Sequence, residues 1–400
     1  MTQESIFTIT KYAYDHVPFY KNLYNQYKIN INNDIQFNDL PIIKKEDIVK
    51  NTEYLISDEY DINYLLKSHT SGTTGLQLFS YNSKEEQFKR AMLMWKEREK
   101  NCSNIMRKRK AMFGDIRGLE DKSTQMINDM LYLSTTYLNS ERLNEYYYIL
   151  NDYQPKFIRC CPSVLYEFVR YMNCNSKKMK YKIDYIEMSN EYLSPGIYKE
   201  LKAFFEETLL INVYGASEFY GIAHACIDNC LHETSESVFI EVVNNDDEGY
   251  GNLLITSLIN KAMPFIRYDI GDFGRIRTDA CSCGRLERIL ELRSGRSLDY
   301  YCDGNRKITA DYFRKVLTEY FHITNDENNF LQFSIHQKRM DLLQYNLLVV
   351  NEIDIESITA FLKNQLNKYL INPVDVIVNT QLNMLDESKT TKFKMYNFIK

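Results

Sequence analysis

The chain has 400 residues, a net charge of −5 and a pI of about 5.8. This balance argues against nucleic acid as a partner, because a nucleic-acid surface needs a basic footprint. No run of eighteen apolar residues predicts a membrane span, and the first residues lack the cationic-then-apolar pattern of a signal peptide. Nine cysteines without such a signal indicate a reducing compartment, so we expect a cytoplasmic protein with no membrane partner.

The length exceeds that of a usual single domain, and the elements taken in chain order predict two. Residues 5–27 predict two helices interrupted near Pro18, and residues 37–48 predict a turn that enters a helix. Residues 84–100 predict a third helix, because Phe88, Met92 and Trp95 recur at helical spacing among charged residues.

A polar loop precedes that third helix and follows the apolar stretch Tyr64-Leu65-Leu66. Glycines let backbone N–H groups turn toward a ligand, and short hydroxyls add uncharged donors, so the loop suits phosphate oxygens. It is not a Walker loop, since no Gly-Lys-Ser/Thr ends it. An isolated polar turn is the alternative interpretation. The loop consists of Thr70, Ser71, Gly72, Thr73, Thr74 and Gly75.

Strands and helices alternate from residue 140 to residue 215. We predict strands at 157–158, 185–188 and 209–213, with helices near 141–151, after Pro162 and from Ser194-Pro195. Such alternation implies right-handed crossovers and a largely parallel sheet, at whose strand ends ligands gather.

The pattern of predicted elements changes after residue 235. Short strands at 237–243, 251–257 and 273–276, separated by Asn, Asp and Gly, predict an antiparallel subdomain over about 235–292. A helix at 310–320, strands at 330–336 and 345–350, and a helix at 355–370 predict a small α+β module. We therefore predict an α/β protein with a large N-terminal domain (1–296), mostly of parallel sheets, a hinge at 295–297 and a small C-terminal domain (297–400).

Three further segments follow the polar loop in order: 214–218 (Tyr-Gly-Ala-Ser-Glu), 264–272 (Pro-Phe-Ile-Arg-Tyr-Asp-Ile-Gly-Asp), and 295–297 (Gly-Arg-Ser) with Asp299. Each is weak alone. Glu218 could cap a helix, Asp272 could belong to a turn, and Arg296 could form a surface ion pair. The ordered set of four is much more specific than any member.

That set resembles the adenylate-forming superfamily, and within it the branch of phenylacetate–CoA ligase and its capsule-cluster relatives, over most of the chain. Segments 40–44, 161–163 and 189–191 also look like landmarks of that branch. The resemblance implies that a carboxylate attacks the α-phosphate of ATP, that pyrophosphate leaves, and that a thiol then displaces AMP from the acyl adenylate. It also implies that the C-terminal domain is a mobile lid.

The resemblance implies a role for each motif. The polar loop, with Thr73 as a catalytic residue, would hold the β- and γ-phosphates; Glu218 would hold Mg²⁺; Asp272 would accept hydrogen bonds from the ribose. Arg296 would lie near the nucleotide, with Asn190 and Glu191 as weaker candidates on the adenine side. The remaining nucleotide candidates are Tyr214, which would flank adenine, and its neighbours Gly215, Ala216 and Ser217.

The same resemblance places a catalytic lysine near the C-terminus, where segment 388–394 carries three lysines. We favour Lys392, although Thr391 stands where relatives have glycine, so Lys389 and Lys394 remain alternatives, as does a chemically silent cationic end. The loop also continues as Leu76-Gln77 where relatives commonly carry Lys-Pro, which removes one cation from the phosphate site.

A second signal concerns metal. Cys226, Cys230 and His232 lie close together in sequence, and Cys281-Ser282-Cys283 follows fifty residues later. Thiolates with imidazole favour tetrahedral Zn²⁺. Likeness to some relatives selects four of these residues as ligands and keeps Cys230 in reserve. A zinc ion with all four ligands from the protein would be structural. The alternative to a metal site is a scatter of small, buried cysteines. The predicted ligands are Cys226, His232, Cys281 and Cys283.

We expect an ATP-dependent ligase that joins a small-molecule carboxylic acid to coenzyme A or to a carrier-protein thiol. Alternatives are a stand-alone adenylating enzyme that transfers the acyl group to a carrier, an amine or a hydroxyl, and a zinc-stabilised scaffold without turnover. Relatives are often dimers, so a homodimer is a further expectation. Phe113, Tyr132 and Tyr137 could line the acid pocket, but we predict that they belong to the core.

Overall fold

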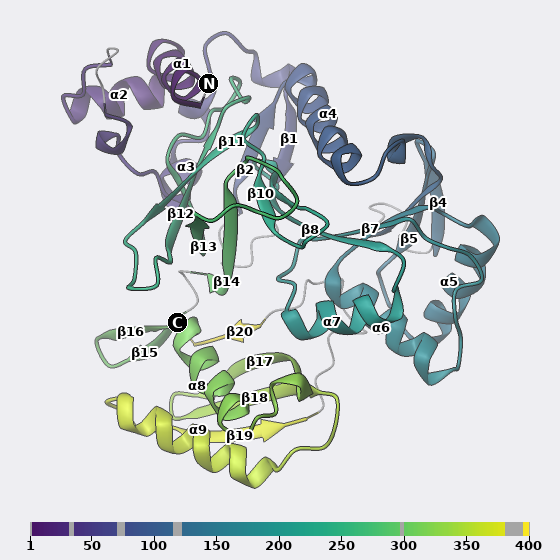
Figure 1. The fold of residues 1–400 in the computed structure, drawn as a ribbon. Helices are drawn as coiled ribbons and strands as arrows, with labels where there is room; N and C mark the ends of the chain where they lie inside the picture. The colour runs from purple at the N-terminus through teal and green to yellow at the C-terminus, as the bar shows by residue number, and fades with distance from the viewer. Residues whose placement is uncertain are drawn as a thin grey trace. The chain divides into compact units, whose positions relative to one another are not determined.

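The computed structural model describes residues 2–31, 36–69, 77–114, 122–296, 300–380 and 395–399. The chain forms two compact units, one of residues 1–106 with 213–293 and the other of residues 107–212 with 294–400. The colours of Figure 1 follow the chain through both. The predicted domain boundary at 296/297 lies three residues from the last change of unit and stays a prediction.

The first unit begins with two helices, α1 (Thr2–His16) and α2 (Pro18–Gln26). Val17 adopts an extended conformation (φ −116°, ψ 109°) because the proline after it disfavours helical backbone, and Pro18 then opens α2. Buried Tyr20 donates to the Pro264 carbonyl (3.0 Å) and accepts from the Ile266 N–H (2.9 Å), which fixes α2 to the 264–272 segment.

Short elements then lead to the long helix α4 (Lys84–Asn101). Ser83 and Glu86 form a capping box, with Glu86 N 3.1 Å from Ser83 Oγ and Ser83 N 2.7 Å from Glu86 Oε2. These two bonds satisfy backbone N–H groups at the start of α4 and so fix where the helix begins. The preceding elements are η1 (Phe37–Asp39), α3 (Lys45–Lys50), η2 (Glu53–Leu55), η3 (Ile62–Tyr64), and the antiparallel pair β1 (Leu66–His69) and β2 (Phe79–Asn82).

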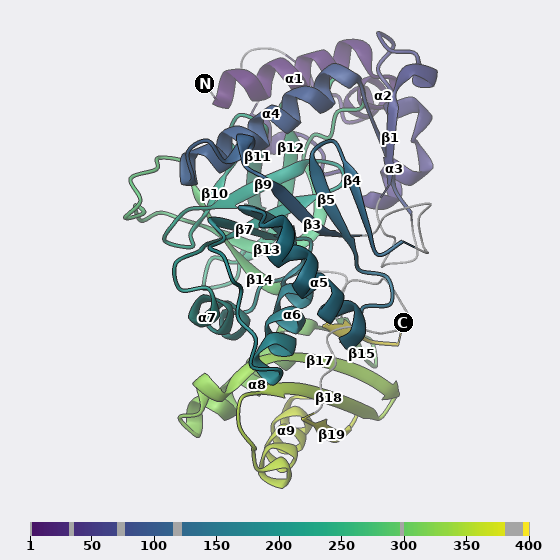
Figure 2. The same cartoon turned by 90° about the vertical axis from the view of Figure 1, so that its right-hand side faces the viewer.

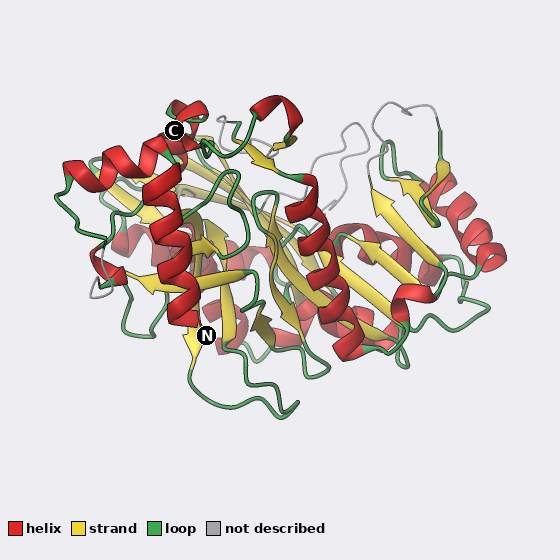
Figure 3. Cartoon of the chain, turned by 90° about the horizontal axis from the view of Figure 1, so that it is seen from above, coloured by secondary structure: helices red, strands yellow, loops and turns green. Residues whose placement is uncertain are grey.

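The main strands of the first unit are neighbours in the order β11-β12-β13-β14-β10-β9, and the second half of β8 pairs with β9. The predicted antiparallel subdomain is confirmed, because β11–β12 and β12–β13 both pair antiparallel. Figure 3 shows these strands in yellow. Their bounds are β8 (Leu209–Ala216), β9 (Tyr220–Ala225), β10 (Leu231–Glu233), β11 (Val238–Val243), β12 (Gly251–Ser257), β13 (Tyr268–Arg277) and β14 (Ile289–Arg296).

The second unit contains the predicted parallel strands. Strands β7, β6, β3 and β5 pair parallel in that order, and β4 closes the edge antiparallel to β5. The α/β prediction is thus confirmed, but β3 to β5 were not predicted. The elements are η4 (Ile105–Arg107), β3 (Lys110–Gly114), β4 (Thr124–Ile127), β5 (Met130–Ser134), α5 (Ser140–Tyr153), β6 (Phe157–Cys160), α6 (Pro162–Cys174), β7 (Tyr185–Ser189) and α7 (Pro195–Phe204).

Helices α5, α6 and α7 share one hydrophobic core with alternate residues of these strands (Figure 2). Phe113 belongs to this core, as predicted. Tyr132 is only half-buried, and the prediction for Tyr137 was wrong: this residue has a positive φ of 54° beyond the end of β5, and it is 58% exposed.

The rest of the second unit is the small α+β module, in which β19-β18-β17-β20 form one sheet. Helix α7 packs against β17, with Ser194 Oγ 2.6 Å from the Leu331 carbonyl. The elements are β15 (Tyr300–Asp303), β16 (Arg306–Thr309), α8 (Ala310–Ile323), η5 (Glu327–Asn329), β17 (Phe330–Arg339), β18 (Leu342–Val349), α9 (Ile355–Tyr369), β19 (Asp375–Asn379) and β20 (Tyr396–Asn397). Among the described helices, none combines the length and apolarity that a bilayer crossing demands.

Candidate functional site

The turn between β8 and β9 carries the predicted Mg²⁺ ligand, Glu218. A Cβ on Gly215 would lie 1.9 Å from the carbonyl oxygen of Tyr220, so only glycine permits this close crossing of the two strands. Tyr220 has a φ of 64°, a conformation that non-glycine residues rarely adopt. The tight turn holds the Glu218 side chain at 4% exposure. A carboxylate in such a setting is an oxygen ligand of the kind hard cations prefer.

Two of the predicted nucleotide residues meet in the structure. The hydroxyl of Tyr214, on β8, donates to Asp272 Oδ2 on β13 at 2.7 Å, although 58 residues separate them in sequence. Both side chains are half-buried. Tyr214, Gly215, Ala216, Ser217, Glu218 and Asp272 therefore belong to one part of the first unit.

The segment before Asp272 pairs with Ile43, near the N-terminus of the chain, through two backbone hydrogen bonds. Ile43 donates to the Arg267 carbonyl (3.1 Å) and accepts from the Asp269 N–H (2.9 Å). Arg267 itself is buried, and its guanidinium pairs with Glu241 (3.1 Å). The sequence contained the signal for this contact in the Leu-Pro-Ile-Ile segment, but spacing alone did not predict its partner.

The rest of the predicted nucleotide site lies outside the described residues or belongs to the second unit. The loop Thr70–Gly75 and Lys392 lie outside the described residues. Arg296 ends β14, where only the backbone is described. Asn190 and Glu191 follow β7 in the second unit. There Glu191 Oε2 accepts from the Ser163 N–H (3.1 Å) at the start of α6, and Asn190 has a φ of 75°.

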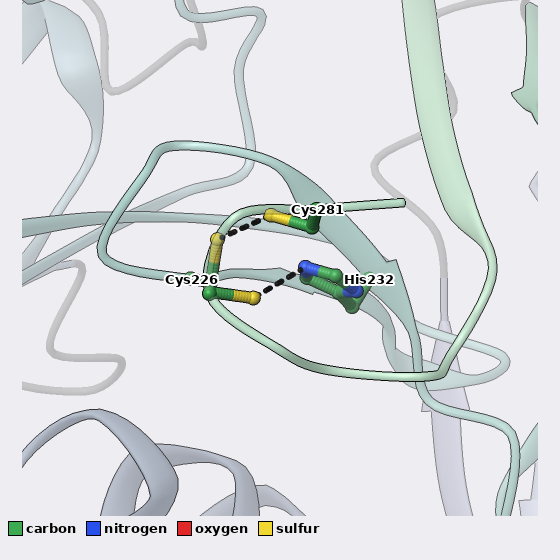
Figure 4. Close-up of side chains that lie close together, drawn as sticks. Cys226, His232 and Cys281 are labelled. Atoms are coloured by element: carbon green, nitrogen blue, oxygen red, sulfur yellow. Dashed lines mark hydrogen bonds between the residues drawn. The ribbon is translucent and has the colours of Figure 1, made fainter. Parts of the chain in front are cut away.

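The four predicted metal ligands come together, and Figure 4 labels three of them, Cys226, His232 and Cys281. One ligand atom from each of Cys226, His232, Cys281 and Cys283 lies within 4.8 Å of all the others. Cys226 Sγ is 3.6 Å from Cys281 Sγ, and Cys283 Sγ is 3.3 Å from His232 Nε2. Thiolates about 2.3 Å from a tetrahedral zinc lie about 3.8 Å apart, so three sulfurs and one nitrogen at this spacing fit Zn²⁺.

Cys230 lies outside this group, and its Sγ is 3.8 Å from the Asp228 carbonyl. The imidazole is oriented, because His232 Nδ1 lies 3.1 Å from the Glu287 carbonyl, which leaves Nε2 for the metal. Burial raises the pKa of the Cys281 thiol, but hydrogen bonds from Cys283, His232 and Cys226 outweigh it and lower that pKa to about 6.

The loop that contains Cys281 and Cys283 contacts α4 through charged residues that the sequence pattern did not single out. Arg285 contacts Glu97 Oε2 (3.3 Å) and Asn101 Oδ1 (3.0 Å), and Lys100 contacts Glu287 (2.7 Å). The helical spacing of Glu97, Lys100 and Asn101 was visible in the sequence, but their partners lie almost 190 residues away. These contacts join the loop of Cys281 and Cys283 to α4.

Comparison with known proteins finds two named relatives, and no family model matches. The chain is 29% identical to phenylacetate–coenzyme A ligase of Thermus thermophilus, over 38% of this chain and 36% of that ligase. It is 22% identical to protein CapK of Staphylococcus aureus, over 86% of this chain and 76% of CapK. The first alignment thus spans about a third of that relative's length.

Solved structures share the fold. A 2-hydroxyisobutyryl-CoA ligase in its postadenylation state superposes with a TM-score of 0.67 at 13% identity, over 100% of this chain and 88% of the ligase. A GH3.15 acyl acid amido synthetase superposes with a TM-score of 0.57 at 11% identity, over 94% and 85% of the two chains.

The fold and the named relatives are both those of the adenylate-forming superfamily. The relatives include a phenylacetate–coenzyme A ligase and CapK, so the resemblance that the sequence indicated is confirmed.

Proposed function

We propose that the chain activates a carboxylic acid with ATP to form an acyl adenylate and pyrophosphate, and then transfers the acyl group to a thiol. The observation that carries the proposal is the meeting of Tyr214 with Asp272 beside the turn that holds Glu218. These residues belong to two separate motifs, and only the resemblance had placed both motifs at one nucleotide-binding site.

Each residue has a chemical part in this proposal. Asp272 would accept hydrogen bonds from the ribose hydroxyls, and Tyr214 would orient its carboxylate while flanking the base. Glu218 would hold Mg²⁺, which when bound neutralises phosphate oxygens. Lys392, or another lysine of segment 388–394, would bring a cation to the oxyanions that develop during attack.

We propose the acceptor of the acyl group from the names of the relatives. Two of them are coenzyme A ligases, so a coenzyme A thiol is the first acceptor to test. The amido synthetase of the same fold motivates an amine as the second. We also propose that Zn²⁺ binds Cys226, His232, Cys281 and Cys283 as a structural ion.

Pyrophosphate release with ATP, Mg²⁺ and a panel of carboxylic acids tests the proposal. The variant Glu218→Ala should lower this rate at least about a hundredfold, because the proposed metal ligand is lost. Glu236→Ala is the matched control, since Glu236 is an exposed acid of the same unit that pairs only with Lys96 (2.5 Å) among the described residues.

Activity that survives in Glu218→Ala at the level of the control would overturn the assignment of Glu218. If no acid in the panel releases pyrophosphate from the unmodified chain, the zinc-stabilised scaffold becomes the better interpretation.

A further inference from the structure

Helix α4 buries an arginine that has no hydrogen-bond partner. Arg90 is 2% exposed, and none of its three guanidinium nitrogens makes a hydrogen bond to any described residue. Burial lowers the pKa of Arg90 to about 10, so the side chain is still a cation at neutral pH. A buried cation without a hydrogen-bond acceptor is costly, and a ligand that supplies the acceptor would remove this cost.

Arg90 lines a small pocket formed by α4, the start of β9 and the segment after β10. A second buried polar atom in the same pocket, Thr234 Oγ1, also lacks a hydrogen-bond partner among the described residues. Ser237 adds a buried hydroxyl. The remaining walls are Leu93, Met94, Phe219, Tyr220 and Gly221. A cation and two hydroxyl groups at one pocket favour a ligand group with several oxygen acceptors.

The nearby acids do not supply those acceptors. Glu86 lies one turn before Arg90, but its Oε1 accepts from the Lys261 N–H (2.6 Å) and the Ala262 N–H (3.0 Å), and its Oε2 accepts from the Ser83 N–H (2.7 Å). Glu218 influences Arg90 only through its charge. The Tyr220 ring, whose centroid is 5.5 Å from Arg90 Cζ, presents its π face to the guanidinium but makes no hydrogen bond with it.

Water cannot serve in the pocket as it stands, because the space is too narrow for a water molecule. A ligand can therefore enter only if a wall moves, and Met94, whose unbranched side chain is flexible, is the wall that can do so. Tyr220 is held at its hydroxyl by Gln87 Nε2 (3.0 Å). Gly221 leaves room for the Met94 side chain, since a Cβ there would lie 2.3 Å from Met94 Sδ.

The pocket is continuous in sequence with the proposed active site, because Phe219, Tyr220 and Gly221 directly follow Glu218. A planar carboxylate matches the fork of a guanidinium group and can also accept from hydroxyl groups. We propose that this pocket, formed by Arg90, Thr234 and Ser237, binds a second carboxylate of the acid substrate, so that the chain activates dicarboxylic acids. This inference rests on the proposed function and names its substrate class.

Matched acids that differ only in the second carboxylate test it: butyrate against succinate, and valerate against glutarate. We expect the diacid of each pair to raise the melting temperature of the chain more, and to be preferred at least about tenfold in kcat/KM for pyrophosphate release. Arg90→Met should abolish both preferences, Thr234→Val should reduce them, and the matched control Lys89→Met, an exposed cation on the same helix, should retain them.

The melting temperature without ligand separates binding from a structural role. Because Arg90 has no hydrogen-bond partner among the described residues, Arg90→Met should fold and be at least as stable as the unmodified chain. A large loss of stability in this variant, together with unchanged diacid preference in Thr234→Val, would overturn the inference. Stabilisation by potassium chloride alone, with no advantage of diacids over monoacids, would also overturn it by assigning the pocket to an inorganic anion.

The two proposals fail in different ways. Pyrophosphate release by monoacids and diacids at equal rates would leave the proposed function standing and remove this inference. Diacid-specific thermal stabilisation that Arg90→Met abolishes, without pyrophosphate release from any acid, would keep the pocket and remove the proposed function.

Discussion

At the scale of single residues, the site depends on side chains that orient one another. The Tyr214 hydroxyl donates to Asp272 Oδ2 at 2.7 Å and so holds this carboxylate. A hydrogen bond to a charged group fixes the rotamers of both partners. The side chains of Tyr214 and Asp272 would then already be oriented before a nucleotide binds.

The variant Tyr214→Phe should weaken ATP binding about fivefold or more, since a net hydrogen bond contributes about 1 kcal/mol. Titration calorimetry with ATP measures the change. Tyr250→Phe is the matched control, because it removes a similar bond to Glu291 (3.1 Å) elsewhere in the same unit. Equal affinities for both variants would contradict a nucleotide role for Tyr214.

At the scale of elements, the cysteine cluster joins β9, β10 and the loop before β14. Arg285 and Lys100 connect this loop to α4 by ion pairs. A metal that holds four ligands of such separate segments restricts the unfolded chain and stabilises the folded one.

We expect the purified chain to contain about one zinc ion, and Cys281→Ser to contain much less and to melt several degrees lower. Mass spectrometry of the metal content and thermal unfolding provide the two measurements. Cys230→Ser, the control, should retain zinc, because Cys230 lies outside the four-ligand group. Zinc loss in Cys230→Ser but not in Cys281→Ser would assign the ligands differently.

At the scale of the whole molecule, each unit is assembled from segments that are distant in sequence. In the second unit, α7 meets β17 across more than 120 residues. A Cβ on Gly196 would lie 2.6 Å from Leu331 Cα and 2.7 Å from the Phe330 carbonyl oxygen. Leu331 and Leu348 share the hydrophobic core of α7.

Gly196→Ala should therefore destabilise the second unit by about 1–3 kcal/mol, the usual cost of overpacking. Hydrogen exchange of β17 and β18 amides should become faster in this variant. Lys199→Ala serves for comparison, because it removes only an exposed contact with Asn328 (2.7 Å) and should change stability little. Unchanged exchange in Gly196→Ala would mean that α7 and β17 do not need this close approach.

The sequence by itself determined most of the elements. Pro18, the Ser83 capping box and the alternation of 157–213 act locally, so a linear pattern contains the information that places each helix or strand. Strands β3 to β5 escaped prediction because their side chains are mixed in polarity, and Tyr137 was misplaced because a backbone turn exposes it.

Only the tertiary structure decided which distant residues meet. The bond from Tyr214 to Asp272, the pairing of Ile43 with residues 267–269, and the burial of Arg90 depend on packing between segments far apart in the chain. Helical periodicity over residues 84–100 predicted the helix but did not single out Arg90. Its desolvation arises because β9 and the segment after β10 cover that face of α4, and a local pattern contains no record of such a contact.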